Sequence, residues 1–165
     1  MRRRKPEPGA LADADEHTVR TAGYALLAGR DFSRHELAER LLRKGYGAAV
    51  VDEAIANIVQ EGFLQEDRFA EQFVSQRARR GHGPVRVRMG LREKGVDAEA
   101  IDTALGTTAT DWIQAAREAR RRKFGLAPPA DYRERAKQAR FLQYRGFSSD
   151  QIRAALGPGD DDPDL

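Results

Sequence analysis

The 165-residue chain contains no cysteine, only one tryptophan and two methionines, and no apolar run near the roughly 18 residues that a membrane span needs. The lack of cysteine excludes disulfides, thiolate zinc sites and a cysteine nucleophile, and it fits a reducing compartment. The basic residues 1–6 lead into a polar stretch, where a signal peptide would have an apolar one. We therefore expect a soluble, cytoplasmic protein with no membrane segment.

The net charge is small over the whole chain but large in one segment. The whole chain has 29 Lys and Arg against 26 Asp and Glu, a net charge of only +3. Residues 77–145 hold 17 Lys and Arg against 8 Asp and Glu, a local excess of +9. A field of this size is typical of proteins that bind nucleic acid or an acidic protein surface.

The two ends differ in composition from the rest of the chain. Residues 1–15 predict a disordered basic arm, and residues 158–165 predict a disordered acidic tail. The arm could add phosphate contacts. The tail could compete with nucleic acid for the basic residues, although a solubilising tail is the simpler interpretation. Between the ends, apolar residues recur at helical spacing, as at Val51, Ile55 and Ile58, and no strand-like alternation occurs, which predicts an all-α fold.

An internal repeat is the most informative pattern. Residues 41–46 recur as residues 91–96 and 142–147, so that Gly45, Gly95 and Gly146 stand 50 and 51 positions apart. A Leu stands four residues before each Gly, Lys or Arg stands one before, and an apolar residue follows directly. Further apolar positions lie six and ten residues after each Gly, at Val51, Ile101 and Ile152 and at Ile55, Leu105 and Leu156.

Each copy of the repeat is typical of a helix that ends at a Gly with positive φ, followed by a tight turn and another helix. One further helix upstream completes a three-helix unit. We predict three tandem three-helix repeats, helix-turn-helix-like, at residues 16–64, 65–108 and 109–157, stacked as an elongated crescent. Capping boxes are expected at Ser33-Glu36 and Ser148-Gln151, and Gly106 is expected to end a helix.

No pattern favours an enzyme. The three histidines stand in three different segments, and the paired carboxylates lie near predicted helix starts, where the helix dipole explains them. Phosphate loops, zinc-binding histidine motifs and serine elbows are missing from the sequence. We predict no catalytic residue, no metal site and no cofactor.

The basic residues are therefore the candidate site. The candidates for contact with nucleic acid or with an acidic protein surface are Arg77, Arg80, Arg86, Arg88, Arg121 and Lys123. The alternative is a solvated helix face with no ligand. The third helix of each unit begins with residues unsuited to reading bases, which disfavours sequence-specific binding. The aromatic residues lie at core periods and predict packing rather than base stacking; they are Tyr46, Phe63, Phe69, Phe73, Trp112, Phe141 and Phe147.

Four groups of residues together resemble the RecX family of recombination regulators. They occupy residues 25–33 with 36–37 and 42–46, then 61–70, 83–96 and 145–152, in the family's order, and the resemblance covers residues 18–156. Gln65 departs from the family's usual residue before the acidic pair, and both charged ends lie outside the match. The resemblance implies tandem three-helix repeats in a crescent, which the repeat spacing predicts independently.

The resemblance also implies a partner, the RecA recombinase filament on single-stranded DNA. Family members are negative regulators that bind in the filament groove and suppress ATP hydrolysis, strand exchange and coprotease activity. The resemblance implies no catalytic residue and no cofactor for this chain. We expect a monomer that binds RecA, with weak direct DNA binding possible. A stand-alone, non-sequence-specific nucleic-acid-binding protein is the alternative.

Overall fold

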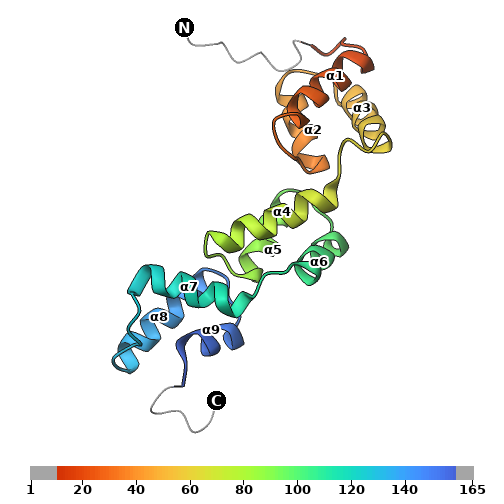
Figure 1. The fold of residues 1–165 in the computed structure, drawn as a ribbon. Helices are drawn as coiled ribbons and strands as arrows, with labels where there is room; N and C mark the ends of the chain where they lie inside the picture. Colours follow the sequence, from red (N-terminus) through yellow and green to blue (C-terminus); the bar gives the residue numbers. More distant parts are fainter. Residues whose placement is uncertain (1–10, 159–165) are drawn as a thin grey trace. The chain divides into compact units, whose positions relative to one another are not determined.

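The computed structural model describes residues 11–158, which contain nine α-helices and no strand beyond an isolated bridge between Leu11 and Tyr46 (Figure 1). The all-α prediction is confirmed. Residues 1–10 of the predicted basic arm and residues 159–165 of the predicted acidic tail lie outside the described part. The helices are α1 (Glu16–Leu27), α2 (Arg34–Arg43), α3 (Ala48–Gln60), α4 (Glu66–Arg79), α5 (Pro84–Glu93), α6 (Ala98–Thr107), α7 (Trp112–Phe124), α8 (Tyr132–Tyr144) and α9 (Ser149–Leu156).

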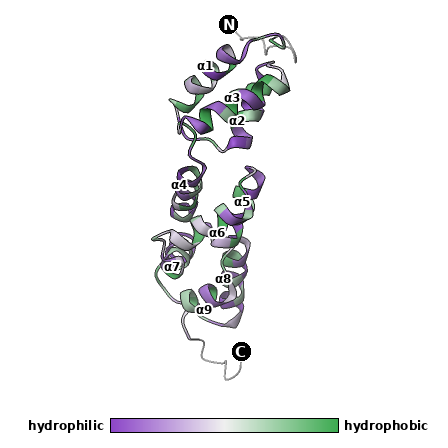
Figure 2. Ribbon diagram, turned by 90° about the vertical axis from the view of Figure 1, so that its right-hand side faces the viewer, coloured by the Kyte–Doolittle hydropathy of each residue, from purple (hydrophilic) through white to green (hydrophobic). Residues whose placement is uncertain are grey.

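The chain divides into two compact units. The first contains the described residues up to Ala70 together with Glu93–Ala100, and the second contains Glu71–Arg92 and the described residues from Ile101 onward. Helices α4, α5 and α6 each contribute to both units, since the boundaries fall within them. Most helices carry both hydrophobic and hydrophilic residues, as expected of helices that bury one face (Figure 2).

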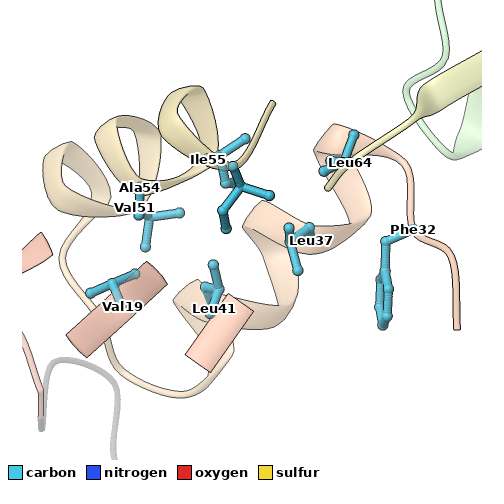
Figure 3. Close-up of a cluster of buried hydrophobic side chains, with 9 residues drawn as sticks. Val19, Phe32, Leu37, Leu41, Val51, Ala54, Ile55 and Leu64 are labelled. Atoms are coloured by element: carbon cyan, nitrogen blue, oxygen red, sulfur yellow. The ribbon is translucent and has the colours of Figure 1, made fainter. Parts of the chain in front are cut away.

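The core of the first unit lies where α1, α2 and α3 pack against one another (Figure 3). Val19 of α1, Leu37 and Leu41 of α2, and Val51 and Ile58 of α3 are fully buried. Each such side chain contributes roughly 1.5–3 kcal/mol when it leaves water. The apolar spacing of these helices therefore reflects one shared core.

Helices α7, α8 and α9 form the corresponding core of the second unit. Leu142 of α8 is fully buried among Ala116 and Ala119 of α7, Phe147 of the α8–α9 turn, and residues of α9. Also within this unit, α4 packs on α5. The two helices are so close that a Cβ added at Gly90 would lie 2.9 Å from Cζ of Phe73.

The repeat positions have the structural roles predicted for them. Gly45, Gly95 and Gly146 have φ values of 101°, 72° and 88°, which favour glycine. The leucines four residues earlier are completely buried, and so are Val51 and Ile101; Ile152 is also buried. Of the residues ten positions after each Gly, Ile55 and Leu156 are buried, whereas Leu105 is half-buried.

Four local predictions need correction. Residues 11–15 do not belong to a disordered arm, because the Leu11 amide donates to the Gly45 carbonyl at 3.1 Å and Asp15 caps α1. Gly106 does not end a helix, since α6 continues to Thr107. Phe63 is 60% exposed, although its ring packs edge-on against Tyr24 with centroids 5.1 Å apart.

The fourth correction concerns Ser33 and Glu36. Ser33 Oγ accepts a hydrogen bond from the Glu36 amide, as predicted, but the Glu36 carboxylate does not reach back to close a capping box. That carboxylate accepts two hydrogen bonds from the Arg30 guanidinium, at 2.9 and 3.0 Å, and one from Lys94 Nζ at 2.8 Å. By contrast, the capping box at Ser148 and Gln151 is complete.

Lys94 belongs to the α5–α6 turn, which docks on the start of α2 within the first unit. Ser33 Oγ donates to the Lys94 carbonyl at 2.6 Å. A Cβ at Gly95 would lie 2.5 Å from Cβ of His35, so the turn can approach this closely only with glycine. Glu36 thus joins two segments that are 58 residues apart in the sequence.

The ion pairs of Glu36 make the stability of the first unit depend on pH. Burial of this carboxyl raises its pKa, but the hydrogen bonds and charges of Arg30 and Lys94 outweigh burial and lower the pKa to about 2. A carboxylate with a lowered folded-state pKa contributes stability that is fully present above about pH 4.5, and that is lost as the pH falls towards 2.

Glu36→Gln should therefore lower the free energy of unfolding by about 1–3 kcal/mol at pH 7. Denaturant unfolding measures this difference, which should shrink between pH 5 and pH 2.5. Glu39→Gln is the matched control, because its 53% exposed carboxylate makes only surface pairs. An equal loss from Glu36→Gln at pH 7 and pH 2.5 would contradict the role given to these ion pairs.

Candidate functional site, an arginine cluster at a repeat junction

The second unit repeats the docking seen in the first. Here the α8–α9 turn docks on the start of α5: the Gly83 amide donates to the Arg145 carbonyl at 2.8 Å, and the Val85 amide donates to the Gly146 carbonyl at 3.1 Å. A Cβ at Gly83 would lie 2.3 Å from the Gly146 carbonyl oxygen, and a Cβ at Gly146 would lie 2.6 Å from Cβ of Arg86. Because neither glycine has a side chain, the α8–α9 turn and the start of α5 can approach each other this closely.

This junction gathers arginines from distant parts of the sequence. Arg86 of α5 donates from Nη1 to the Tyr144 carbonyl at 3.2 Å, and its guanidinium lies 5.3 Å from the centre of the Tyr144 ring. Arg145 donates from Nη1 to the Arg80 carbonyl at 3.3 Å and lies over the ring of Phe141. These contacts fix the guanidinium groups of both arginines at the junction.

Arg77 and Arg80 complete the cluster from the end of α4 and the loop after it. The Arg77 guanidinium lies 4.8 Å from the centre of the Phe73 ring. Its carbonyl accepts hydrogen bonds from the Arg80 and His82 amides, which tighten the end of the helix. The arginine cluster is defined as Arg77, Arg80, Arg86 and Arg145, with His82 among them.

The pKa of His82 depends on the charge of the whole cluster. Burial is the largest influence on its pKa and lowers it below the ordinary 6.5. The positive charges of four arginines lower the pKa further, in the order Arg86, Arg77, Arg145 and Arg80. His82 is therefore neutral at pH 7, and the surface around it is strongly positive. An anion placed there would offset this charge and favour protonation of His82.

The His82 pKa gives a direct test of the cluster. In an NMR titration we expect a pKa below 6.5 in the unmodified chain and a pKa nearer to 6.5 after Arg86→Gln. Because the folded-state pKa is lowered, the stability from neutral His82 is present above about pH 6.5 and is lost as the pH falls below that value. Arg140→Gln, at an exposed position of α8, is the control. Equal His82 titrations in all three chains would contradict the cluster.

The structure brings together three of the six predicted contact residues and separates the others. Arg77, Arg80 and Arg86 belong to the cluster. Arg88 instead forms an ion pair with Asp102. Arg121 lines a separate pocket beside α9, and Lys123 is exposed near the end of α7.

Sequence reasoning missed Arg145 and Tyr144. Arg145 is the basic residue before the repeat glycine, a signal that was available but that also fits a helix C-terminus. Tyr144 is 76% exposed, in contrast to the buried Phe147 three residues later. Arg120, within the basic run of α7, is 6% exposed and donates to Gln138 at 3.0 Å, so its role is structural.

These features define a class: an all-helical protein of three-helix repeats with a strongly basic junction. Within residues 11–158, no group of three or more His, Cys, Asp or Glu side chains could hold a metal ion. No helix of the described part is long and apolar enough to cross a membrane.

The family follows from sequence comparison. Models of the first, second and third three-helix domains of RecX match residues 20–56, 66–105 and 109–156. The chain belongs to the RecX family.

Relatives and solved structures agree with this assignment. The chain is 46% identical to the regulatory protein RecX of Halorhodospira halophila, over 94% of both chains. It is 44% identical to that of Pseudomonas savastanoi pv. phaseolicola, over 87% of this chain and 94% of the relative. The fold is similar to a crystal structure of regulatory protein RecX, with a TM-score of 0.72 at 19% identity, covering 82% of this chain and 70% of the other. It is also similar to that of RecX from Lactobacillus salivarius, with a TM-score of 0.70 at 23% identity, covering 86% and 94%.

Proposed function

We propose that this chain is a negative regulator of the RecA recombinase. It binds in the groove of the RecA filament on single-stranded DNA and suppresses ATP hydrolysis, strand exchange and coprotease activity. It acts as a monomer in the cytoplasm and is not an enzyme. The observation that carries the proposal is the match of all three RecX domain models, in order, along residues 20–156.

The arginine cluster is the proposed contact with the filament. A nucleoprotein filament presents DNA phosphates along its groove, and four guanidinium groups around one neutral histidine would attract them. Occupation of the groove that admits duplex DNA would block strand exchange. Arg121 and Lys123 are proposed as outer contacts. Arg88 would contribute only by exchanging its pairing with Asp102 for the filament.

Binding to the filament can be measured by fluorescence anisotropy of the labelled chain. We expect tighter binding to RecA assembled on single-stranded DNA than to the same DNA alone at the same salt concentration. The affinity should fall as salt is raised, because steering by exposed charges is screened. Equal affinity for bare DNA and for the filament would contradict a regulator that recognises RecA.

A second candidate function, direct binding of single-stranded nucleic acid, is favoured by the exposed Tyr144 ring beside Arg86. Proteins of that kind combine a basic groove with aromatic rings on which bases stack. If the four arginines each contact a phosphate, the logarithm of affinity should fall with the logarithm of salt with a slope of about −3. Tyr144→Ala should then weaken binding to the oligonucleotide without RecA.

A further inference from the structure

A basic pocket separate from the arginine cluster lies at the end of α9. Its volume is about 230 Å³, and its walls come from α7, from the linker after α7 and from residues 154–157. Arg117 and Arg121 contribute exposed cationic side chains, and Leu126 contributes an apolar side chain that is 82% exposed. The pocket therefore offers positive charge beside an uncovered hydrophobic surface.

Part of the negative charge at the end of α9 is offset, because two carbonyls there already accept hydrogen bonds from arginines. Arg117 donates from Nη2 to the Ala154 carbonyl at 3.3 Å, and Arg135 donates from Nη2 to the Gly157 carbonyl at 2.7 Å. Arg120 also lines the pocket, with its guanidinium bonded to Gln138 and to the Ala127 carbonyl. The positive charge of Arg120 therefore adds to the positive potential of the pocket, although its guanidinium already has partners within the chain.

The segment of the chain that starts at this pocket matches it in charge and polarity. Gly157 forms part of the wall, and residues 158–165 follow directly. They include four aspartates, at positions 160, 161, 162 and 164, together with Pro163 and Leu165. Asp160 is three residues beyond Gly157, a reach of up to about 10 Å, so the aspartates can meet pocket arginines without a long connection.

We propose that the acidic tail, residues 158–165, docks in this pocket of its own chain. Aspartate carboxylates pair with Arg117 and Arg121. Exposed ion pairs are individually weak, but a directly tethered ligand has an effective concentration in the millimolar range. The docked tail shields Arg121, one of the outer filament contacts, while leaving the arginine cluster uncovered.

Paramagnetic relaxation tests the docking directly, because a chain without cysteine accepts a single spin label. The label is attached to Leu165→Cys, and signal loss is measured at the backbone amides of residues 117–121. We expect strong loss there, and at least a twofold smaller loss when all four tail aspartates are changed to asparagine or when salt is raised to 0.5 M. The asparagine chain keeps the same tether, so it is the control for proximity alone.

Two substitutions on the pocket side complete the test. Arg121→Gln should reduce the signal loss at the amides of residues 117–120, whereas Arg133→Gln, at an exposed position of α8, should leave it unchanged. The proposal is overturned if the aspartate and asparagine tails give the same loss, or if the tail broadens residues 80–86 in place of α7. The experiment contains no recombinase, so its result is independent of whether the proposed filament regulation holds.

Discussion

Reversing the charge of Arg80 and Arg86 together should weaken binding to the RecA filament by tenfold or more. Both side chains are exposed, and both act on His82 within the arginine cluster. The double variant Arg80→Glu/Arg86→Glu replaces attraction to phosphates with repulsion at the place where four positive charges converge. Fluorescence anisotropy with filament titration measures the change.

A matched double reversal separates the cluster from net charge. Arg133→Glu/Arg140→Glu alters the net charge of the chain by the same amount, at exposed positions of α8 outside the cluster. We expect this variant to bind within about threefold of the unmodified chain. Equal loss of binding in the two double variants would mean that overall charge, rather than the cluster, determines recognition.

The largest effect on stability is expected for Leu142→Ala. Leu142 is completely buried in the core formed by α7, α8 and α9, so its truncation removes apolar contacts and leaves a cavity. The expected loss in the free energy of unfolding is about 2–5 kcal/mol. Denaturant unfolding followed by circular dichroism measures it.

Leu126→Ala is the control for the same chemical change at the surface. Leu126 is 82% exposed, so the expected change is within about 0.5 kcal/mol. Similar losses for the two variants would contradict the assignment of the repeat leucine to the core. That result would also undermine the alignment of residues 41–46, 91–96 and 142–147.

The repeat was predictable because its signals are local. A Leu four residues before the Gly lies in the last turn of the helix that the Gly follows, and the positive φ of the Gly follows from the tight turn. These relations do not depend on the rest of the chain. The buried Leu41, Leu91 and Leu142 therefore appear in the structure where the sequence spacing predicts them.

The partners across the junctions were not predictable in the same way. Arg145 and the Arg80 carbonyl are 65 residues apart, and Glu36 and Lys94 are 58 residues apart. Their meeting depends on how one repeat docks on the next, which no local pattern specifies. Likewise, Arg120 looks like its basic neighbours in the sequence, and only the fold places its guanidinium against Gln138. The basic excess was visible from the sequence, but its division into a cluster, a pocket and ion pairs was not.

We propose that this member of the RecX family acts on the recombinase itself. The most direct measurement is ATP hydrolysis by RecA on single-stranded DNA while the chain is titrated, with DNA binding by the chain alone measured at the same salt. We expect hydrolysis to fall at chain concentrations that leave the DNA itself unbound. Unchanged hydrolysis, together with tight and salt-dependent binding of the chain to bare DNA, would contradict it.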